Sequence, residues 1–277
     1  MSGSLVCVGT GMTLGAHISP ISKSYIENAD IVFSLMSNGI VERWIEEMNS
    51  DVRSLQKYYQ EGKNRNITYR EMVDAIMHQV NQGKKVVAAF YGHPGVFACV
   101  AHKAIAQAKE NNIPAHMEAG ISAEDCLFAD LGIDPGRTGC QHFETSQYMF
   151  FKRNIDPAAH LILWQVGLAG DQSVAKFNTG TAYRKVLVEL LSQHYPLDHQ
   201  VILYQAKVLP IDTIRQDKLA LQDLVTAEIH MHTTLVIPPS QNMQANHAVL
   251  DRLSMIDKQE AKTEKKQKST AKLRLIK

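Results

Sequence analysis

Residues 85 to 97, KVVAAFYGHPGVF, constrain the possible fold of this chain more than any other stretch. After Lys85 the run is apolar without alternation, which is typical of a strand buried on both faces in the middle of a parallel sheet. Gly92, Pro94 and Gly95 end the run in a sterically open loop, and the helical pattern ACVAHKAIAQAKEN follows at once. This order of strand, tight loop and helix predicts an α/β fold.

The rest of the first half repeats the same alternation. Strand patterns occur at 4–8, 30–35 and 114–118, and helical patterns occur at about 10–28, 38–49, 68–83, 101–112 and 122–132. Thr68 and Glu71 have the spacing of a capping box, which predicts that one of these helices begins at Thr68. We therefore expect a mostly parallel sheet in this half of the chain.

The pattern changes after Gly136, where the connections become longer. Strands are expected at 160–166, 199–206 and 231–239, with a helix at 179–195 among them. We predict a first α/β domain over 1–118, a second over 119–240, and a C-terminal helix with a basic tail over 241–277.

Composition limits the class of protein. The chain has 277 residues, of which 45% are hydrophobic and 21% are charged, as in a globular protein with real cores. No apolar stretch reaches membrane-spanning length and the first residues lack a signal-peptide pattern, so we expect no membrane association. Four cysteines show no CxxC spacing, which favours buried free thiols in the reducing cytoplasm.

The basic tail over 258–277 is a separate feature. It holds eight Lys or Arg residues against two Glu, while the preceding part of the chain is mildly acidic. No aromatic residues interleave with the basic ones, so a solvated or frayed tail is favoured over a nucleic-acid contact.

Two motifs give only weak functional signals. In VGTGMTLG the third glycine falls one residue late for a dinucleotide fingerprint, and no acidic residue ends the second strand. His230 and His232 share one face of a strand, but no third ligand lies at informative spacing. The sequence therefore predicts neither a nicotinamide site nor a metal site.

A longer stretch, from Tyr91 to Asp134, carries a specific resemblance. YGHPGVFACVAHK, followed by a strand, GISAEDCLFADLGID and later LILWQV and TTLVIPP, resembles the tetrapyrrole methylase superfamily over nearly the whole chain. The resemblance implies S-adenosylmethionine as methyl donor, with S-adenosylhomocysteine as product, bound in a cleft between two α/β domains. It implies a cofactor site lined by Tyr91, His93, Val96, Ala98, Gln165, Ala206, Thr233 and Thr234.

A second stretch, YYQEGKNRNITYREM, indicates the branch of that superfamily. Tyr59, Arg65 and Tyr69 have the spacing found in borosin-type peptide α-N-methyltransferases, and the chain is similar to their split bacterial form. The first loop, GTGMTLG, departs from the pattern of tetrapyrrole-building members. The resemblance implies a separate precursor peptide as substrate, and the polar, basic KQKSTAKLRLIK is unlike an apolar substrate core.

The chemistry of methylating a backbone amide explains why Tyr59, Arg65 and Tyr69 would be needed. A backbone amide nitrogen is a poor nucleophile until it loses its proton, because its lone pair is delocalised into the carbonyl. Arg65 is suited to hold the negative charge that then develops on the oxygen. Tyr59 or Tyr69 would donate a hydrogen bond to that oxygen or help to take the proton, and the sequence does not assign these roles. Core packing is the alternative for both tyrosines.

Two other functions stay open, and an assembly is implied. The alternatives are a methyltransferase for a tetrapyrrole or another small molecule, and a non-catalytic binding module with the same fold.

The resemblance also implies a homodimer. Candidate surfaces for it are the helix at 38–49 with Trp44 and the segment 246–256 with Val249, Leu253 and Ile256.

Overall fold

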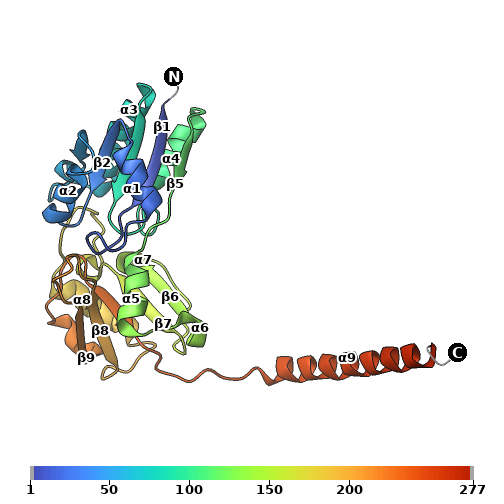
Figure 1. The fold of residues 1–277 in the computed structure, drawn as a ribbon. Coiled ribbons are helices and arrows are strands. Elements are labelled where there is room, and N and C mark those ends of the chain that lie inside the picture. Colours follow the sequence, from blue (N-terminus) through green and yellow to red (C-terminus); the bar gives the residue numbers. More distant parts are fainter. Residues whose placement is uncertain (1–2, 275–277) are drawn as a thin grey trace. The chain divides into compact units, whose positions relative to one another are not determined.

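The computed structural model describes residues 3–274, with side chains described through residue 263. It divides into two compact units, Met1–Ser240 and Gln241–Lys277. The first unit contains two five-stranded sheets, and the second contains one long helix (Figure 1).

The first sheet is parallel throughout and has the order β3-β2-β4-β1-β5. Its strands are β1 (Ser4–Gly9), β2 (Ile31–Leu35), β3 (Val52–Ser54), β4 (Lys85–Phe90) and β5 (Ala115–Met117). β4 lies in the centre, where Val87 pairs with Val32 on one side and Val6 on the other. The residues of β4 after Lys85 are all buried, which confirms the expected central strand.

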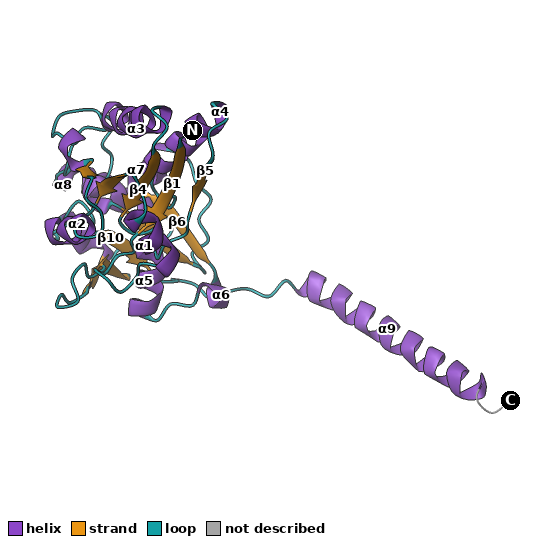
Figure 2. Ribbon diagram, turned by 45° about the horizontal axis from the view of Figure 1, so that its top comes forward, coloured by secondary structure: helices purple, strands orange, loops and turns teal. Residues whose placement is uncertain are grey.

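Helices cover both faces of this sheet. The helices α1 (Pro20–Glu27) and α2 (Gly39–Glu46) pack against one face, and α3 (Arg65–Asn81) and α4 (Val100–Glu110) pack against the other. In Figure 2 the strands of the first unit lie inside, and the helices lie around them. Trp44 of α2 is half-buried and packs against the core beneath its own helix, and its expected part in a subunit contact stays a prediction.

Two helix predictions were wrong in position. Residues 10–19 form a loop, and α1 begins only at Pro20, where Ser19 caps the helix and the proline occupies the first turn. The helix expected to begin at Thr68 begins at Arg65, because the Asn64 side chain accepts the hydrogen bond from the backbone N–H of Asn66. The Thr68 hydroxyl instead donates to the carbonyl of Tyr58 at 3.3 Å.

The second sheet is mixed and has the order β6-β7-β10-β8-β9. Its strands are β6 (Cys140–Glu144), β7 (His160–Trp164), β8 (Gln200–Gln205), β9 (Arg215–Ala220) and β10 (Thr234–Ile237). β6 and β7 are parallel, whereas β10 is antiparallel to both of its neighbours. A parallel first sheet and a mixed second sheet confirm the predicted α/β fold class.

Shorter elements complete the first unit. The helices are α5 (Ala123–Leu131), α6 (Pro135–Thr138), α7 (Thr145–Phe150) and α8 (Thr181–Leu191), and the 3-10 turns are η1 (Gln56–Tyr58), η2 (Val166–Leu168) and η3 (Leu221–Val225). Both sheets belong to one compact unit, so the predicted boundary between separate domains at residue 118 stays a prediction.

The second unit is the helix α9 (His247–Arg274). The expected frayed tail is therefore helical up to Arg274, and the last three residues of the predicted tail lie outside the described residues. Val249, Leu253 and Ile256 are exposed on this helix. Within residues 3–274, no helix has both the length and the apolar character needed to cross a bilayer.

Candidate active site

The loops that follow β1, β4 and β5 meet at the carboxyl end of the parallel sheet, the edge where α/β folds bind ligands. Gly11 and Gly92 form a two-way backbone bridge, with N–H to O distances of 3.1 and 2.8 Å. A Cβ atom on Gly9 or Gly120 would lie 2.4 or 2.5 Å from the carbonyl oxygen of Gly92. The glycines are therefore required because three backbone segments pack directly against one another.

Tyr91 and His93 occupy this loop in different ways. The Tyr91 side chain is 44% exposed, yet desolvation raises the pKa of its hydroxyl, with a further contribution from Tyr69. His93 accepts a hydrogen bond from the backbone N–H of Gly95 on Nδ1, at 2.9 Å, which fixes its ring. Val96 and Ala98 are half-buried in the same loop.

The predicted residues of the second half gather at one end of the second sheet. Gln165 directly follows β7, Ala206 directly follows β8, and Thr233 precedes β10, which runs antiparallel between those two strands. The Thr233 hydroxyl accepts from Gln205 Nε2 at 2.6 Å and from the backbone of His230 at 2.9 Å. Thr233 and Thr234 are buried, whereas Gln165 is exposed in a left-handed conformation with φ +57°.

Contacts between neighbouring residues bring the two groups together. Phe97, in the loop after β4, packs on Trp164 of β7 with ring centroids 5.5 Å apart. Thr13, in the loop after β1, donates to the carbonyl of Lys207 at 3.3 Å, beside Ala206. The structure thus places the two predicted sets on adjoining loops of one compact unit.

The three predicted catalytic residues lie together on the α3 side of the first sheet. Arg65 and Tyr69 are one turn apart in the first turns of α3, and Tyr59 follows η1. The rings of Tyr59 and Tyr69 meet edge to face with centroids 6.3 Å apart. Both rings also pack against the core of the first sheet, so the packing alternative describes part of their role.

Electrostatics distinguishes the two tyrosines. Burial raises the pKa of Tyr59 far above its ordinary value, and Tyr69 and Tyr91 raise it further. Burial also raises the pKa of Tyr69, as does Cys99, but a hydrogen bond from Tyr59 and the charge of Arg65 act in the opposite direction. The charge of Arg65 thus lowers the pKa of Tyr69, whereas every contribution to the pKa of Tyr59 raises it.

Asp171, a residue that sequence reasoning missed, contacts this group. Its carboxylate lies 3.5 Å from Nη2 of Arg65, and the two side chains are 1% and 15% exposed. No periodic pattern marks its segment, GDQSVAK, and 106 positions separate it from Arg65. The only signal in the sequence was an acidic residue within a polar segment.

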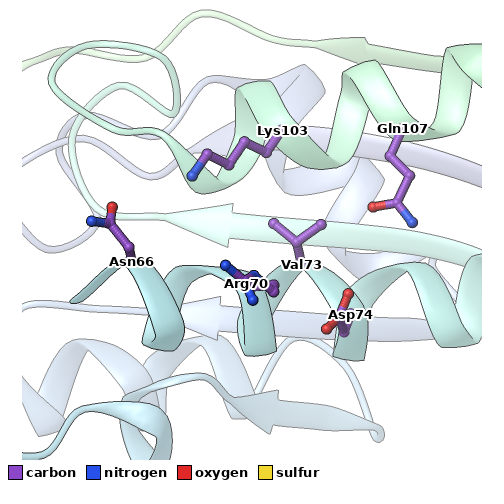
Figure 3. A pocket seen from close by; sticks show the side chains of 6 residues that line it. All are labelled: Asn66, Arg70, Val73, Asp74, Lys103 and Gln107. Carbon is purple, nitrogen blue, oxygen red and sulfur yellow. The ribbon is translucent and has the colours of Figure 1, made fainter. Parts of the chain in front are cut away.

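Two of the surface depressions in the described part of the chain differ in their relation to the predicted site. The first, of about 330 Å³, lies between α3 and α4 and is lined by Asn66, Arg70, Val73, Asp74, Lys103 and Gln107 (Figure 3). It contains none of the predicted site residues and lies on another side of α3. The second, of about 440 Å³, includes Gln205, Ala206 and Lys207 and adjoins the predicted cofactor residues.

The histidines after η3 do not form a metal site in the described part of the chain, where no group of three suitable ligands occurs. The rings of His230 and His232 stack with centroids 5.9 Å apart. Burial lowers the pKa of His232, and the nearby His230 and Arg215 lower it further. Both rings are therefore explained by packing and local hydrogen bonds.

Comparison with known proteins decides the family. The sequence profile described as Tetrapyrrole (Corrin/Porphyrin) Methylases matches residues 4–220. This chain belongs to the tetrapyrrole methylase family.

Relatives of this tetrapyrrole methylase family member are methyltransferase–precursor proteins of fungi. It is 38% identical over 261 residues to the "Methyltransferase/ribosomally synthesized cyclic peptide gymnopeptides precursor" of Gymnopus fusipes, covering 92% of this chain and 62% of the relative. The omphalotin A precursor of Omphalotus olearius is also 38% identical, with the same coverage. A type I borosin cyclic peptide precursor of Coprinopsis marcescibilis is 34% identical, covering 95% of this chain and 69% of the relative. The chain thus spans about three-fifths of the length of the first two relatives.

Solved structures agree on the fold of the family. A uroporphyrin-III-C-methyltransferase from Thermus thermophilus superimposes with a TM-score of 0.59 at 16% identity, covering 86% of this chain and 93% of that one. A cobalt precorrin-4 methyltransferase gives a TM-score of 0.61 at 13% identity, covering 85% and 94%. At these identities the likeness concerns the fold alone.

Proposed function

We propose that this family member transfers methyl groups from S-adenosylmethionine to backbone amide nitrogens of a ribosomally made peptide. The observation that carries the proposal is the grouping of Tyr59, Arg65 and Tyr69 beside the loop that follows β4. The relatives' names supply the class of substrate, since they combine a methyltransferase with a cyclic peptide precursor.

The residues present fit the proposed cofactor. Tyr91 and Gln165 are exposed, Gln165 directly follows Trp164, which contacts Phe97, and Ala206 lines the second depression. S-adenosylmethionine would supply an electrophilic methyl group on a sulfonium. The non-glycine residues Phe97 and Gln165 both have positive φ, a strained state that clusters at functional sites. Buried Thr233 would act indirectly, by fixing Gln205.

The three catalytic candidates would divide the work on the acceptor amide. Arg65 would hold the developing charge on the amide oxygen, because its guanidinium keeps donors beyond the two bonds it makes in the protein. Tyr69 is the better candidate for taking the amide proton, since Arg65 and Tyr59 both favour its ionised form. Tyr59 would support the Tyr69 oxygen by donating to it.

We propose that the acceptor peptide is a separate chain. The similarity of the chain to the split form of the borosin-type enzymes supports this proposal. The intact mass of the purified protein tests this directly. If methyl groups accumulate on the protein itself, the acceptor is part of its own chain.

We also propose a homodimer and a cytoplasmic location. Val249, Leu253 and Ile256 lie exposed along α9, where a second copy would cover them. Light scattering of the intact protein should give twice the mass of one chain, and Leu253→Asp should halve it, whereas Ile211→Asp in the first unit should not.

The cysteines support the proposed cytoplasmic location. All four are free, and burial raises the pKa of Cys126 and Cys140 to about 11, as in unreactive thiols of a reducing compartment.

Co-expression with a candidate precursor peptide, such as a short open reading frame beside the gene, tests the central proposal. Tandem mass spectrometry should show one or more methyl increments located on backbone nitrogens. The precursor region of the gymnopeptide relative serves as a second acceptor. Methylation of a tetrapyrrole but of neither peptide would instead assign a small-molecule methyltransferase, and cofactor binding without any transfer would assign a binding module.

A further inference from the structure

We infer that Asp171 is a positioning residue that holds Arg65 in place, through its charge and through the loop 171–176, called here the Asp171 loop. The contacts stand on the structure alone, while their meaning for catalysis rests on the proposed function. Asp171 itself would touch neither cofactor nor substrate.

The carboxylate of Asp171 organises its own loop. Oδ2 accepts hydrogen bonds from the backbone N–H groups of Ala175 and Lys176, both at 3.0 Å. Oδ1 accepts from the backbone N–H of Ser173 at 3.0 Å and from the Ser173 hydroxyl. Burial alone would raise the pKa of Asp171, but these four hydrogen bonds together outweigh it and lower the pKa. The group is thus a fixed anion.

The Asp171 loop is in turn hydrogen-bonded to the start of α3. The carbonyl of Val174 accepts from the backbone N–H of Arg65 at 2.8 Å, and the carbonyl of Ala175 accepts from that of Gly62 at 3.0 Å. The carbonyl of Ser173 accepts from the side-chain amide of Asn64, the residue that caps α3, at 3.0 Å. Both the backbone and the cap of the first turn therefore depend on this loop.

The Arg65 side chain is held at two points. Nη1 donates to the carbonyl of Lys176 at 2.7 Å, and Nη2 lies 3.5 Å from Oδ2 of Asp171. The same carboxylate oxygen binds the N–H of Lys176, so it fixes one partner of Arg65 while attracting Arg65 itself. These contacts limit the rotation of a long side chain that would otherwise lose entropy on meeting the amide oxygen.

The loop is also strained, as expected for a segment held in place by its surroundings. Val174 has φ +53°, a strained conformation that β-branched residues rarely adopt. The bonds from Ala175 and Lys176 to Asp171 and the bond from Arg65 to Val174 hold this residue from both sides. Loss of the carboxylate should release the strain and free the loop.

Direct action of Asp171 on the substrate is disfavoured by its surroundings. Its side chain is 1% exposed and both oxygens already accept hydrogen bonds. A carboxylate whose pKa is lowered is also a weak proton acceptor. The remaining route to the reaction runs through Arg65.

Hydrogen exchange tests whether the Asp171 loop holds the start of α3, and it requires no measurement of activity. In Asp171→Asn, amide exchange should accelerate in 171–177 and also in 62–66, while β4 stays protected. Asp134→Asn is the matched control, because Asp134 accepts a hydrogen bond from its own loop but makes no recorded contact with 62–66. Faster exchange in 171–177 alone would overturn the inference.

Ser173→Ala is a milder variant if Asp171→Asn does not fold. It removes one hydrogen bond to the carboxylate and retains all charges. A smaller acceleration in the same two segments supports the inference, and unchanged exchange in 62–66 contradicts it.

A double-mutant cycle tests the catalytic consequence on the peptide that co-expression identifies. Asp171→Asn should lower kcat on the order of tenfold to a hundredfold, with the KM for S-adenosylmethionine unchanged, because a misplaced group reduces the rate of a positioned reaction. In the Arg65→Ala background the same change should cost nothing more. Multiplying losses would show that Asp171 acts independently of Arg65. Absence of methylation in the unaltered protein would instead refute the proposed function and leave the exchange result intact.

Discussion

The ring of Tyr59 stands edge-on to the ring of Tyr69, with centroids 6.3 Å apart and planes at 87°. The two residues come from different local structures, a 3-10 turn and the first turns of α3. Their pairing gives two chemically identical side chains different properties. Burial raises the pKa of both, but every other contribution to the pKa of Tyr59 raises it further, while the charge of Arg65 lowers the pKa of Tyr69.

Replacing Arg65 should slow methyl transfer strongly. Arg65→Ala should lower kcat on the order of 10² to 10³, the usual effect of losing a well-placed oxyanion partner. Binding of S-adenosylmethionine, measured by calorimetry, should change little. Arg70→Ala is the matched control, since Arg70 lies on the same helix but faces the depression shown in Figure 3. Equal losses in both variants would contradict the role of Arg65.

The two tyrosines should differ in mutational effect. Tyr69→Phe should reduce kcat more than Tyr59→Phe, because the first removes the proposed proton acceptor and the second removes only its hydrogen-bond donor. Quenched-flow mass spectrometry at saturating donor measures both. The reverse order would exchange the two roles.

The pH dependence follows from the raised pKa of Tyr69. Since its ionised form is scarce below that pKa, kcat should rise with pH across the neutral and mildly alkaline range. Arg65 lowers the pKa of Tyr69, so Arg65→Ala should move the rise to higher pH, and Arg65→Lys should move it less. A pH-independent kcat in the unaltered protein would argue against Tyr69 as the base.

Alkaline pH should destabilise the fold through Cys7. Burial raises the pKa of this thiol from 9.0 to about 12, so the folded state retains a proton that the unfolded chain releases. The associated stability is fully present below pH 9.0 and is lost progressively as pH rises towards about 12. Chemical denaturation at a series of pH values should show this decline, with a shallower slope in Cys7→Ala. An identical slope in both proteins would assign the decline to other groups.

The close backbone contacts of Gly92, in the loop that follows β4, should be sensitive to one added carbon on a neighbouring glycine. Gly120→Ala would place Cβ 2.5 Å from the Gly92 carbonyl oxygen, so the free energy of unfolding should fall by about 1–3 kcal/mol. Gly39→Ala in α2 is the control, because no atom lies within 4 Å of its added Cβ. Thermal unfolding measures both, and a neutral Gly120→Ala would show that these backbones can separate easily.

Local sequence determined those elements that contain a continuous run of apolar residues. The central strand β4 and its glycine loop followed from VVAAFY and GHPG, because a strand buried on both faces needs apolar residues throughout. The strands β3, β6 and β9 were not anticipated, and all three lie at sheet edges. Edge strands are half solvated, so RQDKLA and CQHFE lack the continuous apolar run that marks a strand buried on both faces.

The spacing of Tyr59, Arg65 and Tyr69 was likewise available from sequence, although their roles were not. Only the folded chain brings Asp171 beside Arg65 and places the first turn of α3 three residues earlier than its capping pattern suggested. A long-range contact made the first decision, while the local Asn64 cap, itself bonded to Ser173, made the second, and neither leaves a periodic trace in the sequence. Sequence thus specified the chemical groups, whereas tertiary packing set which neighbours shift the pKa of each tyrosine and what holds the arginine.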